Sequence, residues 1–162
     1  MSDQAPGTEF APRTMWIGEA QDHAPVTVER GPEPVVNRPP QVKEIVSGIL
    51  ALAARTGERI PLAKCHAIVH AMKSQEPILS GLRFSLTGDV CFSRDIDQAI
   101  NILIDGGFLK IDGQSAVVTG RAHQFWRYLG GSLANSRIQD IHSVSLRFHD
   151  RLRRDVKNPC IS

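Results

Sequence analysis

The sequence predicts an α+β fold that is mainly helical, and three observations lead to this fold class. Apolar residues recur at helical spacing in several segments, most clearly at Ile96, Ile100 and Leu103. Two short apolar runs flank Asp112-Gly113, a dipeptide that favours a tight hairpin turn. The chain has 162 residues, of which 41% are hydrophobic, and this is enough for one core with appendages but not for two large domains.

The stretch of residues 93–119 combines these signals in one order. Ser93 is predicted to cap a helix that carries the apolar stripe at 96, 100 and 103. Gly106 or Gly107 can take the left-handed conformation that ends a helix, and the hairpin follows at once. A capped helix, a glycine stop and a two-stranded hairpin are typical of the second half of a winged-helix domain.

Helices are also predicted before this stretch. Residues 41–55 form an amphipathic pattern that ends near Gly57, and residues 61–73 form a second one with Pro61 at its first position. Residues 82–86 alternate between apolar and polar like an edge strand, and a turn is predicted at 87–89.

After the hairpin, a helix is predicted over 121–129 and a last helix from about 132 to 158, with one apolar side. We therefore divide the chain into an extended proline-rich arm (1–40), a winged-helix domain with a two-stranded wing (41–131) and a basic amphipathic C-terminal helix (132–158). The apolar side of the last helix consists of Ile138, Ile141, Val144, Phe148 and Leu152.

The arm differs from the rest of the chain in composition. It holds seven of the ten prolines and carries six acidic and three basic residues, so its net charge is −3 and residues 41–162 carry the remaining +5 of a total of +2. Trp16 and Ile17 form an apolar island in it. Exposed residues of this kind gain by burial, either on a partner or on the chain's own domain. We name Trp16 and Ile17 as candidate partner-binding residues.

The helix before the wing argues against direct DNA recognition. In a winged-helix protein this helix normally offers Arg, Lys, Asn or Gln to bases and phosphates. Here it offers Asp95, Asp97 and Asp105 against Arg94 alone, and carboxylates beside phosphates cost electrostatic energy. Ile102 lies opposite the apolar stripe, so the outer face of the helix is expected to contact protein.

Two further groups are candidate contact residues. Trp126 falls off the apolar stripe of its helix and is predicted to be exposed for docking. Any nucleic-acid contact is expected at the arginines near the chain's C-terminus, although Asp150 and Asp155 lie among them and favour ion pairs instead. These arginines are Arg147, Arg151, Arg153 and Arg154.

No pattern in the sequence points to catalysis or to a cofactor. His66 and His70 have the i, i+4 spacing of metal ligands but lack a third ligand nearby, and solvated surface histidines are the expected alternative. The sequence contains neither a GxSxG elbow nor a GxxxxGK[ST] loop. We expect no enzyme activity, no metal, no cofactor and no small-molecule substrate.

Cysteine usage and hydropathy bear on the compartment. The three cysteines are odd in number, widely spaced and without a CxxC motif, as is typical of free thiols in a reducing compartment. No stretch approaches the ~20 apolar residues of a membrane span. We therefore expect a cytoplasmic protein that does not bind membranes.

Three segments carry a resemblance to a known family: Arg59–Lys64, Phe84–Asp89 and Ile96–Leu109. Together they resemble the small winged-helix accessory subunits, or middle components, of bacterial three-component systems built on an SMC-like or ABC-type ATPase, such as Lamassu-type phage defence. They also resemble phage-associated winged-helix proteins of the antitoxin kind. The resemblance covers roughly residues 42–130 and implies a non-catalytic subunit that binds an ATPase or an effector.

The function expected from these observations is that of an accessory or scaffold subunit in a bacterial anti-phage or anti-plasmid defence complex. Its partner would be an SMC-like or ABC-type ATPase, with a nuclease effector as a further partner, and DNA would be contacted indirectly or weakly. The alternative is a small winged-helix transcriptional regulator or antitoxin that binds DNA itself.

Overall fold

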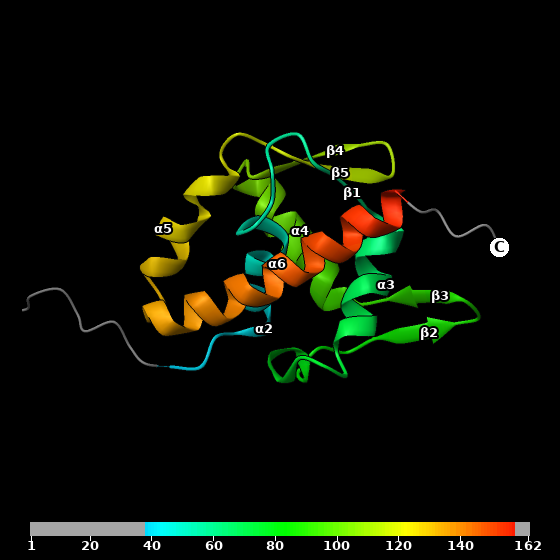
Figure 1. Cartoon of the computed structure of the whole chain (residues 1–162), viewed down its shortest axis with the longest axis horizontal. Coiled ribbons are helices and arrows are strands. Elements are labelled where there is room, and N and C mark those ends of the chain that lie inside the picture. Colours follow the sequence, from blue (N-terminus) through cyan, green and yellow to red (C-terminus); the bar gives the residue numbers. More distant parts are fainter. Residues whose placement is uncertain (1–37, 158–162) are drawn as a thin grey trace, which may run out of the picture. The chain divides into compact units, whose positions relative to one another are not determined.

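The structure, a computed structural model of the chain, describes residues 38–157. Trp16 and Ile17, the arm residues predicted to bind a partner, lie outside the described residues. The described part is α+β and mainly helical, with small sheets and a long C-terminal helix (Figure 1). Its helices are α2 (Val42–Ala51), α3 (Leu62–Met72), α4 (Arg94–Asp105), α5 (Phe125–Gly130) and α6 (Asn135–Lys157), with 3-10 turns η1 (Pro77–Leu79) and η2 (Ala122–Gln124).

The strands form two separate antiparallel sheets (Figure 1). The first sheet has the order β1-β5-β4, from β1 (Arg59–Pro61), β5 (Ser115–Val118) and β4 (Leu109–Asp112). The second is a hairpin of β2 (Ser85–Thr87) and β3 (Val90–Phe92). The β4–β5 hairpin confirms the one predicted at Asp112-Gly113, and Gly113 has the positive φ (+62°) that this turn requires.

Helices α2 and α6 form the centre of the core. Val46, Ile49 and Leu50 of α2 are fully buried, and α2 packs against both α4 and α6. All five residues on the predicted apolar side of the last helix are buried as well. Helix α6 therefore shares one core with residues 41–131, and burial of this apolar surface is the main term that holds it there.

Helix α4 confirms the predicted apolar stripe, since Ile96, Ile100 and Leu103 are all buried. Ser93 occupies the N-cap position of α4, as predicted, but its hydroxyl makes no capping hydrogen bond. Its backbone N–H donates to Nδ1 of His66 on α3 (3.0 Å). The helix ends as expected, with Gly107 in the left-handed region (φ +75°).

Helix α2 is shorter than the predicted 41–55 because a side chain from α6 enters its hydrogen-bond ladder. The hydroxyl of Ser145 donates to the carbonyl of Ile49 (2.7 Å) and accepts from the N–H of Ala53 (3.0 Å). In a continuing helix these two backbone groups would bond to each other. The helix therefore ends at Ala51.

Two other predicted boundaries are wrong because pairing partners lie elsewhere in the chain. Pro61 is not the first helical residue of α3 but the last residue of β1, where it pairs with Ser115 of β5. The edge strand predicted over 82–86 begins only at Ser85, since Leu82 is buried in the core. The strand that follows it, β3, is not predicted by the sequence pattern.

Candidate interaction surfaces

The outer face of α4 is the first candidate interaction surface. Its exposed side chains include Asp97, Gln98 and Asp105, while Asp95 and Ile102 are half-buried. A carboxylate oxygen of Asp95 accepts the backbone N–H of Arg83 (3.0 Å). Carboxylates in the first turn also interact favourably with the helix dipole, so Asp95 and Asp97 stabilise the start of α4. The same charges repel phosphates.

Ile102 lines a hollow of about 390 Å³ between the start of α2, α4 and α5. Phe125 and Tyr128 form its aromatic wall, with stacked rings 5.3 Å apart. Ser47 contributes a buried hydroxyl that has no hydrogen-bond partner among the described residues. The hollow thus joins an apolar wall to an unpaired hydroxyl, a combination suited to a side chain of a protein partner.

One rim of this hollow is fixed by an ion pair. Arg38 donates to both carboxylate oxygens of Glu44 (2.9 and 2.6 Å), and the backbone N–H of Gln41 donates to Glu44 as well (2.8 Å). Burial raises the pKa of Glu44, but these hydrogen bonds outweigh it and the net pKa is lowered. The pair therefore fixes the start of α2.

Trp126 is not the exposed aromatic residue of α5 that the sequence predicts, and Tyr128 takes that place. Trp126 is half-buried against the core, with its ring 4.9 Å from that of His142 on α6. Tyr128 is the exposed aromatic residue of α5, with 58% of its surface accessible. Sequence reasoning missed Tyr128 because its spacing from Phe125 is equally typical of a buried position. The partner-binding role of Trp126 stays a prediction.

The four arginines predicted to contact nucleic acid all bond to groups of the domain itself. Arg147 donates to both carboxylate oxygens of Glu76 (2.5 and 2.8 Å). Arg153 donates to both carboxylate oxygens of Glu58 (2.8 and 3.2 Å). Arg151 donates to the amide oxygen of Gln75 (2.6 Å), and Arg154 donates to the carboxylate of Asp150 (3.2 Å). Three of the four charges are thus paired with a carboxylate.

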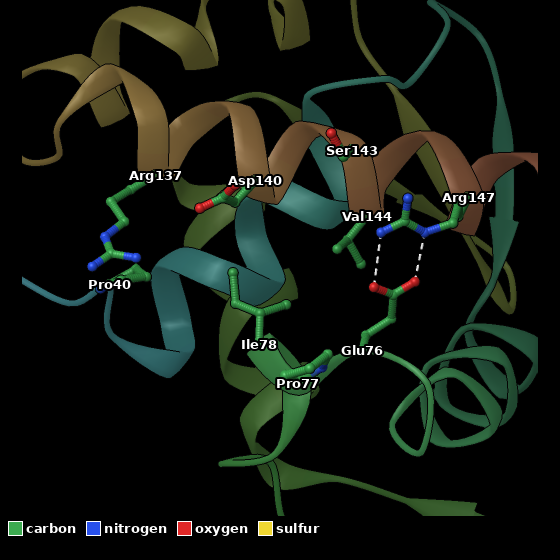
Figure 2. A pocket seen from close by; sticks show the side chains of 9 residues that line it. All are labelled: Pro40, Glu76, Pro77, Ile78, Arg137, Asp140, Ser143, Val144 and Arg147. Atoms are coloured by element: carbon green, nitrogen blue, oxygen red, sulfur yellow. Dashed lines mark hydrogen bonds and ion pairs between the residues drawn. The ribbon is translucent and has the colours of Figure 1, made fainter.

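Figure 2 shows the groove that the Arg147–Glu76 pair closes at one end. Val144 of α6 and Ile78 of η1 line it with apolar surface, and Arg137 lies near its other end, beside Pro40 (Figure 2). Its volume is about 480 Å³, within the range of small-ligand sites, but its opposite charges and open form do not select one ligand class.

A buried cluster around Glu58 ties the segment before β1 to α6. His149 is fully buried with Nδ1 3.1 Å from a carboxylate oxygen of Glu58, and Arg153 approaches the same carboxylate. Burial raises the pKa of Glu58, yet the nearby imidazole of His149 and hydrogen bonds from the N–H of Arg55 and from Arg153 lower it to about 2. The cluster places charged groups between the segment before β1 and α6, and it lines none of the cavities described here.

Cys65 and His66 lie next to each other on α3. His66 is buried rather than solvated, and its Nδ1 accepts the N–H of Ser93. Burial lowers the pKa of this imidazole. Burial also raises the pKa of Cys65 to about 12, so this thiol is a poor nucleophile at neutral pH. No cluster of three metal-ligating residues occurs within residues 38–157. Nor is any helix in that range long and apolar enough to span a bilayer.

Comparisons with models of protein families, with curated proteins and with solved structures found no match to this chain.

Proposed function

We propose that residues 41–131 form a winged-helix domain, against which the C-terminal helix packs, and that the protein is a non-catalytic accessory subunit of a multiprotein complex. The topology supports the fold. Helix α2, strand β1, helix α3, helix α4 and the hairpin β4–β5 occur in this order, with η1 and the β2–β3 hairpin inserted between α3 and α4, and the sheet order is β1-β5-β4. In a winged helix, α4 is the helix that faces the DNA and β4–β5 is the wing.

The observation that carries the proposed role is the chemistry of α4. Three carboxylates, at Asp95, Asp97 and Asp105, accompany its one arginine, and Ile102 opens into a hollow walled by aromatic rings. Such a face is unfavourable for a groove lined by phosphates and favourable for a protein surface. The arginines of α6 are mostly engaged within the domain, which further lowers the charge available to DNA.

The resemblance of residues 42–130 to middle components of three-component systems suggests the partner. We take it to be an SMC-like or ABC-type ATPase of a bacterial anti-phage or anti-plasmid defence complex in the cytoplasm, with a nuclease effector as a further partner. In such a complex the ATPase holds the DNA, and this subunit contacts it indirectly or weakly. The Trp16–Ile17 island of the arm is a second candidate contact.

The alternative function, a small DNA-binding regulator or antitoxin, is favoured by the topology itself. Arg94 on α4 and Lys110 on the wing are both exposed and could contact phosphates. Duplex binding measured by fluorescence anisotropy at several salt concentrations separates the two functions, because a direct binder releases several counterions and its affinity falls steeply with salt. A steep slope together with sequence preference would establish the regulator and overturn the accessory role.

The partner itself is tested by copurification from the native host followed by mass spectrometry. The accessory role predicts an ATPase that carries a GxxxxGK[ST] loop. Ile102→Arg should reduce its retention at least tenfold, since a partner that fills this hollow would remove the added charge from water. Leu146→Arg, at an exposed apolar position on α6, is the matched control and should leave retention unchanged. Equal retention of the ATPase by both variants would exclude α4 as the contact face.

A further inference from the structure

The side chain of Ser47 gives the hollow between the start of α2, α4 and α5 a polar group within an apolar lining. Ser47 lies in the middle of α2 and is 2% exposed, and its hydroxyl has no hydrogen-bond partner within the described residues. Buried polar groups without a partner cost free energy, so native proteins pair nearly all of them. Because Ser47 lines the hollow, a group that enters the hollow can supply the partner.

The wall beside Ser47 is flat and apolar. The rings of Phe125 and Tyr128 stack with their centroids 5.3 Å apart, and Ile102 of α4 lines the hollow with them. The volume of about 390 Å³ lies near the lower limit of ligand sites and leaves room for one large side chain. Aromatic rings pack on such walls in stacked or edge-to-face contact. The wall therefore favours a flat aromatic group.

The hollow exists before any partner binds. Glu44 holds Arg38 and the N–H of Gln41 at one rim (2.9 and 2.8 Å), and Phe125 and Ser47 are fixed by their burial in the core. A side chain that enters a preformed site orders few groups of the protein, so less of its interaction energy is lost to ordering.

The charges at the rim favour an acidic neighbour beside the aromatic group. Arg38 and Glu44 neutralise each other, whereas Lys43 is exposed and makes no ion pair within the described residues. One positive charge is therefore uncompensated among the three. Complementary charge on a partner increases the rate of association and orients it.

We propose that this hollow binds a tryptophan side chain of the partner protein, beside an acidic residue, with the indole N–H donating to the hydroxyl of Ser47. The inference rests on the proposed function, in which the face of α4 contacts a protein. Indole has one donor and no acceptor, so a single hydrogen bond satisfies it. The serine hydroxyl can then donate to the carbonyl of Lys43 one turn earlier, as serines in helices do.

Other aromatic side chains fit the same site less well. Phenylalanine would fill the hollow but leave the hydroxyl of Ser47 unpaired. The tyrosine hydroxyl both donates and accepts, so it needs a further partner that the aromatic wall does not offer. The hydrogen bond from a donor-only ring is thus the feature that an experiment must isolate.

Indole itself is the probe, and 1-methylindole, which has no N–H, is its matched control. We expect indole to bind the full chain with a Kd on the order of millimolar, as small fragments do, and to shift the backbone NMR resonances of Ser47, Ile102 and Tyr128. 1-Methylindole should bind roughly fivefold more weakly, because it cannot make the buried hydrogen bond.

Three substitutions distinguish the hydrogen bond from the wall. Ser47→Ala should weaken indole binding roughly fivefold and leave 1-methylindole unchanged, with no fall in the thermal midpoint, because the hydroxyl has no partner in the free domain. Tyr128→Ala should weaken both probes by the same factor, since it removes only apolar wall. Ser143→Ala removes an exposed hydroxyl on α6 and should change neither.

Charged derivatives test the rim. Indole-3-acetate should bind the natural chain roughly threefold more tightly than tryptamine does, and Lys43→Glu should reverse this order. Lys110→Glu, at an exposed position on the wing, is the control and should leave the order unchanged.

The complex with the copurified ATPase tests the occupant. Fluoroindole followed by fluorine NMR relaxation should bind the free chain and lose its Ser47-dependent binding in the complex, where the tryptophan of the partner fills the hollow. The proposal is overturned if 1-methylindole binds as tightly as indole, if Ser47→Ala weakens both probes equally, or if the Ser47-dependent binding persists in the complex. If no ATPase copurifies, the proposed function fails, whereas the indole measurements still decide the chemistry of the hollow.

Discussion

The two hairpins of the domain have similar turns and opposite environments. In β4–β5, Leu109, Ala116 and Val118 are buried, and β1 covers the outer edge of β5. In β2–β3, no strand residue is fully buried and no third strand is present within the described residues. Both turns use a glycine of positive φ, at Gly113 and at Gly88. The difference therefore arises from partners distant in sequence and not from the turns.

This contrast distinguishes a hairpin that stabilises the domain from a hairpin that is free to bind another molecule. A hairpin that is covered on one face and paired on one edge contributes to the stability of the domain. A hairpin with an uncovered face and an unpaired edge contributes little to the stability of the domain, and its apolar side chains remain available for another molecule. Substitutions at matched positions in the two hairpins can measure the difference.

The largest difference in lost stability is expected between substitutions of two valines, one in each hairpin. Val118→Asp in β5 places a carboxylate at a 1%-exposed position, which costs several kcal/mol, about the whole stability of a small domain. Val90→Asp in β3 places the same group at a 66%-exposed position and should change stability by less than about 0.5 kcal/mol. Soluble yield and thermal unfolding followed by circular dichroism measure both. Equal damage from the two variants would show that β2–β3 belongs to the core.

Hydrogen exchange should show the same contrast without substitution. The N–H of Val118 donates to the carbonyl of Glu58 (2.9 Å) inside the three-stranded sheet, so its exchange should require global unfolding. Backbone amides of Thr87 and Val90 should exchange roughly a hundredfold faster or more, through local opening. Comparable protection of all three at low protein concentration would contradict the open state of the second hairpin.

The free energy of unfolding should depend on pH through Glu58, which ties the segment before β1 to α6. Its pKa is lowered from an ordinary 4.5 to about 2, so its stabilising contribution is complete above pH 4.5 and is lost as the pH falls toward 2. Glu58→Gln should destabilise the domain at pH 7 by about 1 to 2 kcal/mol, and the deficit should shrink across this window. Urea unfolding at pH 7, 4 and 2.5 measures it. A deficit that does not change with pH would mean that the carboxylate charge is not responsible.

The smallest difference in unfolding free energy is expected between alanine substitutions at the two turn glycines. A Cβ added at Gly113 or at Gly88 meets no atom within 4 Å, so alanine costs only the strain of a positive φ, about 1 kcal/mol. Gly113→Ala should lower the global unfolding free energy by this amount. Gly88→Ala should lower it less, because an open hairpin can relax without unfolding the domain. A larger loss at Gly88 would reverse the comparison.

The elements predicted well are those whose signal is local. The stripe of α4 and the hairpin turn at Gly113 each depend on residues only a few positions apart, and both are confirmed. Strand β1 has only three residues and exists because β5, more than fifty residues later, pairs with it. Periodicity cannot detect such a strand.

The candidate site was predictable to a smaller degree. The acidic residues of α4 follow from the sequence, since they occupy the positions between the buried ones. The bonds from Arg147 to Glu76 and from Arg153 to Glu58 do not, because the partners lie 71 and 95 residues apart. A count of positive charge therefore overstates the charge that α6 offers to other molecules.

The hydroxyl of Ser145 at the end of α2 has a consequence for synthesis on the ribosome. Residues 42–51 emerge before α6, which carries both the group that completes the end of their helix and the apolar side that covers it. Until α6 has emerged, the nascent chain exposes the apolar residues of α2 to solvent. The domain can close only once α6 has left the ribosome, so chaperones can bind the unfinished chain until then.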